Sequence, residues 1–258
     1  MVSVSVIGCG NMGSALITGL ARTNGHTVTA CDVDPQALDA VSPYADETTT
    51  DPSVAAEADV VVLAVKPGLV ADVIDDLDLS AEQTLVSLAA GVSTTFLDPR
   101  TEATVVRVMP NLAAETGNMA AAVTGEDVGD EVRSILDAVG EYVEVDEAQM
   151  DVATAVNGSG PAFVFYLVQA MADAGVAGGL SEDDAETLAA QTFKGAAETL
   201  LRSERSADEL IDAVCSPKGT TIEGMEVLWD SDVDETIAAA VAAAEARSSE
   251  LAAEFGDA

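Results

Sequence analysis

Three glycines near the beginning of the chain have the spacing of a turn that binds dinucleotide cofactors. Gly8, Gly10 and Gly13 follow a run in which valine alternates with serine, and they precede apolar residues at helical spacing. In such a turn the first glycine allows the tight bend, the second lets the backbone approach a pyrophosphate, and the third lets the helix pack on the strand. The alternative is a tight strand–helix connection that binds no ligand. We expect a cofactor site made of Gly8, Cys9, Gly10, Asn11, Met12 and Gly13.

An aspartate in the position that reads the adenine ribose supports this expectation. Asp32 lies 19 residues after Gly13 and closes the apolar run 27–31. A carboxylate there can accept hydrogen bonds from both ribose hydroxyls, whereas a 2′-phosphate would meet both Asp32 and Asp34. The chain has no lysine or arginine between Arg22 and Lys66 to offset that repulsion. The sequence therefore favours NADH over NADPH.

Two polar segments in the second half, and one lysine in the first, could bind a small substrate. Residues 157–161 (Asn-Gly-Ser-Gly-Pro) and 216–221 (Ser-Pro-Lys-Gly-Thr-Thr) each precede an expected helix. Backbone N–H groups and hydroxyls at a helix N-terminus can hold a carboxylate, but ordinary helix capping explains them equally well. Lys66 follows a buried strand in a chain with three lysines, which favours a ligand role over simple charge balance.

Catalysis by the protein's own nucleophiles is excluded by composition. His26 is the single histidine and lies in a turn before the second expected strand, and Cys9, Cys31 and Cys215 are scattered. These spacings predict neither a metal site nor a disulfide framework nor a serine–histidine pair. A cofactor must therefore supply the chemistry, while the protein supplies position and electrostatics.

The charge of the chain indicates its surroundings. It has 46 acidic and 10 basic residues, a net charge of -36, and the charges are spread along its length. At salt near 1 M the screening length is about 3 Å and the self-repulsion largely disappears, so we expect a protein of a salt-rich cytoplasm. Nucleic acid is excluded as a partner because no basic stripe exists. We also expect no membrane segment, since the apolar run 236–244 falls far short of about 20 residues.

Short strands alternating with helices predict the fold class. The run 60–65 is continuously apolar, as in a parallel strand buried on both faces, and further strands are expected at 27–31, 84–88 and 104–109. The fold class is α/β, with an N-terminal doubly wound Rossmann-type sheet followed by an all-α C-terminal domain. We expect a cofactor domain at 1–150 and a helical domain for dimerisation and substrate binding at 151–258. The helix at 161–176 is apolar almost all round, which predicts burial on every side, partly against a second subunit.

Seven segments together resemble one enzyme family, pyrroline-5-carboxylate reductase. They are residues 8–13, 64–67, 87–92, 107–111, 157–163, 172–176 and 216–222, in the order and approximate spacing of that family. The resemblance covers nearly the whole chain. It implies NAD(P)H-dependent hydride transfer to the C=N bond of 1-pyrroline-5-carboxylate, the last step of proline biosynthesis. It also implies a homodimer, sometimes assembled into larger rings, whose interleaved helical domains build each substrate site.

The resemblance also assigns residues to roles. Ser216, Gly219 and Thr220 would hold the substrate carboxylate, and Thr221 would hydrogen-bond the ring nitrogen, with Lys66 and Glu204 as further catalytic candidates. Asn111 would lie on the floor between the domains, touching both substrate and cofactor. The cofactor site would gain Ala64, Val65, Lys66, Pro67, Ala89 and Ala90. Two departures from the family pattern stand out: Lys218 replaces a glycine, and Leu112-Ala113 replaces Thr-Pro.

Two other functions remain possible on the sequence. β-Hydroxyacid dehydrogenases combine a similar cofactor domain with helices, but they resemble one another in a lysine on the helix after the glycine-rich interdomain segment. Residues 161–176 contain no lysine. A dinucleotide sensor without catalytic activity is the alternative from a different class.

Overall fold

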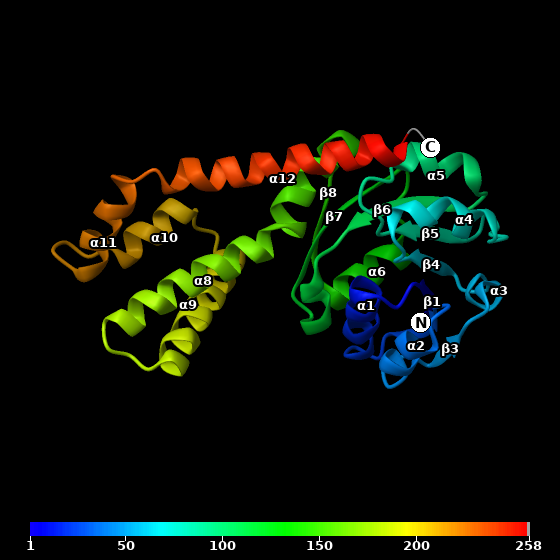
Figure 1. Ribbon diagram of the computed structural model, residues 1–258, viewed down its shortest axis with the longest axis horizontal. Helices are drawn as coiled ribbons and strands as arrows, with labels where there is room; N and C mark the ends of the chain where they lie inside the picture. The colour runs from blue at the N-terminus through cyan, green and yellow to red at the C-terminus, as the bar shows by residue number, and fades with distance from the viewer. Residues whose placement is uncertain (257–258) are drawn as a thin grey trace. The chain divides into compact units, whose positions relative to one another are not determined.

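The computed structural model describes residues 1–256 and divides them into two compact units (Figure 1). The first unit contains Met1–Ser159 together with the described part of the chain from Val241 onward, and the second contains Gly160–Ala240. The expected cofactor domain, 1–150, ends nine residues before this boundary. The difference arises because the short helices that follow residue 146 pack on β7. The end of the last helix contacts Asp151 and Gly91 of the same unit.

An eight-stranded sheet forms the centre of the first unit, in the order β3-β2-β1-β4-β5-β6-β7-β8. The neighbouring pairs from β3 to β6 are parallel, β7 runs antiparallel to β6, and β8 is parallel to β7. The strand order reverses between β1 and β4, which is where doubly wound sheets bind dinucleotides. The expected Rossmann-type fold is confirmed. The strands are β1 (Val2–Ile7), β2 (His26–Cys31), β3 (Glu47–Thr49), β4 (Val60–Leu63), β5 (Thr84–Ser87), β6 (Thr104–Met109), β7 (Met119–Gly125) and β8 (Gly140–Glu144).

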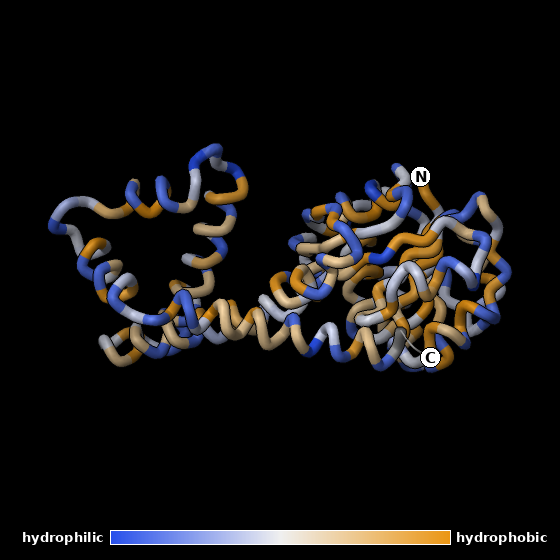
Figure 2. Tube along the Cα trace, turned by 90° about the horizontal axis from the view of Figure 1, so that it is seen from above, coloured by the Kyte–Doolittle hydropathy of each residue, from blue (hydrophilic) through white to orange (hydrophobic). Residues whose placement is uncertain are grey.

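Helices cover both faces of this sheet. The core on one face joins the strands to α1 and α6 through residues such as Ile17 and Leu136, and the core on the other joins them to α4 and α5 through Ile74 and Leu97. Hydrophobic segments gather accordingly in the strands of this unit (Figure 2). The helices are α1 (Asn11–Ala21), α2 (Pro35–Val41), α3 (Pro52–Ala55), α4 (Val70–Asp75), α5 (Thr94–Leu97), α6 (Asp130–Val139) and α7 (Met150–Ala153).

The second unit is helical throughout its described residues, as expected. Its helices are α8 (Gly160–Ala177), α9 (Glu182–Arg202), α10 (Ala207–Val214), α11 (Thr220–Trp229) and the first part of α12 (Val233–Gly256). The polar starts of α9 and α10 explain where these helices begin, because the hydroxyls of Ser181 and Ser206 cap them by accepting from backbone N–H groups.

Burial of α8 on every side is not found within one chain, and its expected burial against a second subunit stays a prediction. Every residue of α8 is at least partly exposed, with Phe165 72% and Tyr166 73% accessible. The apolar surface of this helix exceeds what α9 can cover, so the single chain leaves it in contact with water.

One continuous helical stretch is long and apolar enough to cross a membrane, judged by length and composition alone. It runs from Glu147 to Ala177, and 6% of its most apolar window is buried. This stretch includes α8, whose exposed apolar side chains are also the ones that we expect a second subunit to cover.

Candidate functional site

The glycine turn between β1 and α1 has the geometry that a bound pyrophosphate requires. Gly8 has a φ of +100°, and a Cβ there would meet the carbonyl oxygen of Ala64 at 2.8 Å. A Cβ on Gly13 would lie 1.9 Å from the carbonyl oxygen of Gly8, so only glycine lets the helix approach the turn. At Gly10, in contrast, nothing lies within 4 Å of an added Cβ. The middle glycine therefore faces open space, and the residues present fit a dinucleotide.

Gly10 is also the N-cap residue of α1, and it has no side chain that could cap the helix. The first N–H groups of the helix consequently have no side-chain acceptor at this cap. A phosphate at this position would accept from these groups and would be stabilised by the helix dipole.

The Asp32 carboxylate holds the glycine turn in place. Its Oδ2 accepts the backbone N–H of Cys9 at 2.6 Å, and its Oδ1 accepts that of Asp34 at 2.9 Å. Each carboxylate oxygen can accept a second hydrogen bond. Asp32 can therefore bind ribose hydroxyls while it holds the turn, and its role is wider than the one expected from the sequence.

A cleft of about 400 Å³ opens beside Asp32 at the carboxyl ends of the strands. It brings together six of the residues expected to bind the cofactor: Gly8, Gly10, Asp32, Ala64, Val65 and Lys66. The sequence analysis missed the remainder of the lining. These residues lie at or just after the ends of β1, β2 and β3, on α3, and on α4 and the turns at its two ends. They are Ile7, Cys31, Val33, Thr50, Pro52, Leu69, Val73 and Asp76.

The thiols beside the glycine turn are held in their protonated form. Burial, and then the charge of Asp32, raises the pKa of Cys9 to about 12 and that of Cys31 to about 11. All three cysteines of the chain are free. Neither buried thiol is a nucleophile at neutral pH, which agrees with the expectation that the cofactor supplies the chemistry.

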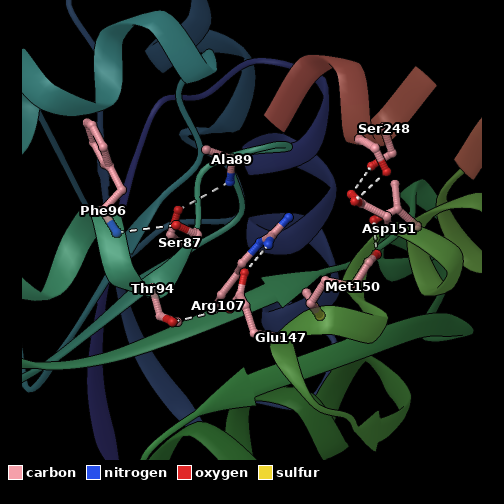
Figure 3. Close-up of polar contacts among 12 residues, drawn as sticks. Ser87, Ala89, Thr94, Phe96, Arg107, Glu147, Met150, Asp151 and Ser248 are labelled. Carbon is pink, nitrogen blue, oxygen red and sulfur yellow. Dashed lines mark hydrogen bonds and ion pairs between the residues drawn. The ribbon is translucent and has the colours of Figure 1, made fainter. Parts of the chain in front are cut away.

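Eight of the residues expected to bind the cofactor do not line that cleft: Cys9, Asn11, Met12, Gly13, Pro67, Ala89, Ala90 and Asn111. Ala89 and Ala90 lie in the loop after β5. The buried hydroxyl of Ser87 accepts the backbone N–H of Ala89 at 3.3 Å (Figure 3). Next to it, Arg107 on β6 is 4% exposed and forms an ion pair with Glu147, which also accepts a hydrogen bond from Thr94. This buried cation was not anticipated as part of the site.

The side chain of Asn111 hydrogen-bonds to backbone groups around the end of β6. Its Oδ1 accepts the N–H groups of Ala113 at 3.1 Å and Ala120 at 3.4 Å, and its Nδ2 donates to the carbonyl oxygen of Asn157 at 3.1 Å. Asn157 in turn donates to the carbonyl oxygen of Met109 at 2.6 Å. In this arrangement the Asn111 side chain organises the backbone, and direct binding of substrate or cofactor by Asn111 stays a prediction.

The second expected site is a tight turn before α11 in the helical unit. The N–H of Gly219 donates to the carbonyl oxygen of Ser216 at 2.9 Å, and Lys218 has a φ of +60°. With proline at the second position and a positive φ at the third, this is the pattern of a type II turn, which ordinarily has glycine where Lys218 stands. A Cβ on Gly219 would lie 2.9 Å from the backbone carbonyl oxygen of Ser216, so glycine is favoured there.

The remaining candidates of the helical unit lie around α10. Thr220 and Thr221 are the first two residues of α11, and Thr221 is half-buried. Glu204 is exposed in the turn before α10, while Ser216 follows α10. The length of that helix, about 12 Å, separates Glu204 from the turn along the chain.

Known proteins resemble this chain over both units. Residues 147–251 match the family model described as pyrroline-5-carboxylate reductase dimerisation, and residues 3–91 match the model described as NADP oxidoreductase, coenzyme F420-dependent. The chain is 39% identical to the pyrroline-5-carboxylate reductase of Methanosarcina acetivorans, over 96% of this chain and 97% of that protein.

Two solved structures also resemble this chain in their fold. Pyrroline-5-carboxylate reductase from Coxiella burnetii has a TM-score of 0.88 at 32% identity, covering 97% of this chain and 98% of that one. Plasmodium falciparum pyrroline carboxylate reductase with NADP bound has a TM-score of 0.81 at 28% identity, with coverages of 97% and 98%.

Proposed function

The chain belongs to the pyrroline-5-carboxylate reductase family, and we propose from that membership that it reduces the C=N bond of 1-pyrroline-5-carboxylate with NAD(P)H to give L-proline. This is the last step of proline biosynthesis. The observation that carries the proposal is the 39% identity over 96% of the chain, because that span includes both the glycine turn and the turn at 216–221.

The chain's own residues bind and orient rather than react. A nicotinamide held in the cofactor site would supply the hydride that the carbon of the C=N bond accepts. The glycine turn and the cleft beside Asp32 hold the cofactor, with Lys66 as the cleft's cation. In the helical unit Ser216, Gly219 and Thr220 hold the substrate carboxylate, and the Thr221 hydroxyl accepts a hydrogen bond from the protonated ring nitrogen. A protonated imine is already electrophilic, so no histidine is needed as a general acid.

NADH is proposed as the preferred cofactor. Asp32 presents a negative charge where a 2′-phosphate would lie, and the cleft's other charged residues are Lys66 and Asp76. Ribose hydroxyls can donate to the free lone pairs of the Asp32 carboxylate, whereas a phosphate would be repelled.

A homodimer, or a larger ring built from dimers, is proposed as the working form. The exposed apolar side chains of the helical unit support it, since burying one such side chain is worth roughly 1.5–3 kcal/mol. A second copy could also bring its own Glu204 toward the turn at 216–221. The exposed set includes Val164, Phe165, Tyr166, Met171, Leu188, Leu200, Leu201, Val214, Val227, Leu228 and Trp229.

A salt-rich cytoplasm is the proposed location. The net charge of -36 needs screening by counter-ions, and three free cysteines suit a reducing compartment.

The deciding experiment is an assay of purified protein in high salt with NADH or NADPH and three substrate classes. We expect turnover with 1-pyrroline-5-carboxylate and formation of proline. Oxidation of NAD(P)H by the aldehydes that correspond to 3-hydroxy acids, and not by the imine, would identify a β-hydroxyacid-type dehydrogenase. Cofactor binding without turnover of any imine or carbonyl compound would identify a sensor.

A further inference from the structure

The loop after β5 is confined from two sides. Ala89 and Val92 are 2% and 1% exposed because they pack into the core beside the sheet. On the other side Gly91, with a φ of +77°, meets the end of α12. A Cβ added to Gly91 would lie 3.0 Å from the backbone nitrogen of Ala252 and 3.1 Å from the carbonyl carbon of Leu251. The loop and the helix therefore touch backbone to backbone, with no room for a side chain.

The end of α12 is fixed by one carboxylate. The hydroxyl of Ser248 donates to Oδ1 of Asp151 at 2.7 Å, and that of Ser249 donates to Oδ2 at 2.7 Å (Figure 3). Ser248 is 7% exposed, so this contact is shielded from water. Hydrogen bonds to an ionised acceptor are about twice as strong as neutral ones, so Asp151 holds the end of α12 strongly.

The segment that carries Asp151 also contacts the nicotinamide end of the sheet. Met150, on the same α7, packs with Met109 of β6, and Ala90 of the loop packs against that cluster. Three residues earlier, Glu147 binds Arg107 of β6 and Thr94 of α5. The short stretch from Glu147 to Ala153 thus joins β6, the loop after β5 and the end of α12.

We propose that residues 248–252 of α12, held by Asp151, are a positioning element for the loop Ala89–Gly91 and through it for the nicotinamide ring. This inference rests on the proposed function, together with the family resemblance, which implies that Ala89 and Ala90 line the nicotinamide side of the cofactor site. Asp151 and the α12 residues touch neither cofactor nor substrate in this account. They act by fixing the loop, and a reacting group displaced by about 1 Å can lose about 100-fold in rate.

The test compares two substitutions of Asp151 in the full-length, assembled enzyme. Asp151→Ala removes both acceptors, whereas Asp151→Asn keeps a carbonyl acceptor and adds an N–H donor, so that both serine hydroxyls can still pair. We expect Asp151→Ala to lower kcat about tenfold and to raise the primary deuterium isotope effect on kcat with 4-deuterated cofactor. KM for the imine should stay unchanged, and Asp151→Asn should restore both quantities.

A matched control lies on the same helix. Arg247 pairs with Glu250 and Glu254 on the exposed side of α12, so Arg247→Gln disturbs the helix without touching Asp151 or Gly91. Wild-type kcat and isotope effect are expected for it. An Asp151→Ala enzyme that is folded and assembled but has the wild-type kcat and isotope effect would overturn the proposal, as would an equal loss in Arg247→Gln.

Two further variants keep the test informative if Asp151→Ala does not fold. Ser249→Ala removes one exposed hydroxyl, and Gly91→Ala inserts a methyl group between loop and helix. The same rise in isotope effect is expected from Gly91→Ala, and its absence there would refute the proposal.

If the wild type reduces no imine, the proposed function fails by itself. Titration of NADH fluorescence then still decides the positioning role, because Gly91→Ala should weaken binding, and equal binding would overturn it.

Discussion

The carboxylate of Asp32 accepts the backbone N–H of Cys9 across 2.6 Å, so the residue expected to read the ribose also holds the glycine turn. A substitution of Asp32 must therefore be judged by the ratio between two cofactors rather than by activity alone. Damage to the turn weakens both cofactors, whereas loss of the charge favours the one with the 2′-phosphate.

Asp32→Ser should shift the ratio of kcat/KM toward NADPH by about tenfold, because a unit charge about 4 Å from a phosphate is worth ~1–4 kcal/mol. Steady-state kinetics with both cofactors in high salt measures it. Asp34→Ser is the matched comparison: it removes the second charge that a 2′-phosphate would meet and keeps a residue able to cap α2, so a smaller shift in the same direction is expected. An unchanged ratio in Asp32→Ser would show that Asp32 does not face the ribose.

Thr221→Ala and Ser216→Ala should each raise the barrier of the reaction by roughly 1–3 kcal/mol, since each removes one positioned hydrogen bond. The Kd of NADH should stay at the wild-type value, because the cofactor turn lies in the other unit. Thr236→Ala serves as control, since that hydroxyl bonds only within α12, to the Asp232 carbonyl oxygen. Wild-type kcat/KM in both site variants would mean that the substrate binds elsewhere.

Lys218→Gly should increase the free energy of unfolding by about 1 kcal/mol, because a residue with a side chain pays that order of cost at positive φ and glycine does not. Lys194→Gly, in the interior of α9, should instead destabilise by about 1 kcal/mol. Denaturant unfolding of both variants measures the two effects. Destabilisation by Lys218→Gly would show that the side chain makes a contact worth more than the strain.

Phe165→Glu should dissociate the assembly, because it places a charge on the most apolar face of α8, where Phe165 is 72% exposed in the single chain. Light scattering in molar salt measures the size. Val143→Glu, on an exposed apolar residue of β8, should leave it unchanged. The wild type should dissociate or unfold as salt falls below about 1 M. A folded, active monomer would contradict the dimer.

Stability should fall in alkali through Cys9 and Cys31. Their pKa values in the folded chain, about 12 and about 11, exceed the usual 9.0, so the unfolded chain releases these protons first. The thiols therefore leave stability unaffected below pH 9.0 and decrease it as the pH rises toward 11. The double variant Cys9→Ala/Cys31→Ala should lose stability less steeply over that range in urea unfolding. An identical slope would refute the burial argument.

Patterns local in the sequence correctly predicted the strand, turn and helix at the start of the chain. The strand, the three glycines and the helix are neighbours in the chain, so Gly8, Gly10 and Gly13 could be assigned from spacing. β3 was missed because Glu47–Thr49 is three polar residues with no alternation to detect. Weak strand character was detectable around Met119, but the antiparallel direction of β7 was not, since strand direction depends on the connection and not on side-chain pattern.

Contacts between distant residues could not be predicted in this way. Ser248 and Asp151 are separated by 97 positions, and neither lies in a motif. Burial of α8 was predicted from its composition, but composition does not tell whether the covering surface belongs to the same chain. Arg107 belongs to the segment 107–111, yet its partner Glu147 becomes evident only when β6 and the turn before α7 are placed side by side.

Because the end of α12 belongs to the first unit, this unit can complete its folding only late in synthesis. Domains generally fold as their residues leave the ribosome, at about 5–20 residues per second. Here the segment from Val241 onward, which packs on Gly91 and Asp151, is made only after all of Gly160–Ala240. The sheet can form early, but the loop after β5 must wait several seconds for its neighbour. A chain released from a ribosome that stalls within α10 or α11 would therefore contain the glycine turn. Its loop after β5 would lack the contact with α12.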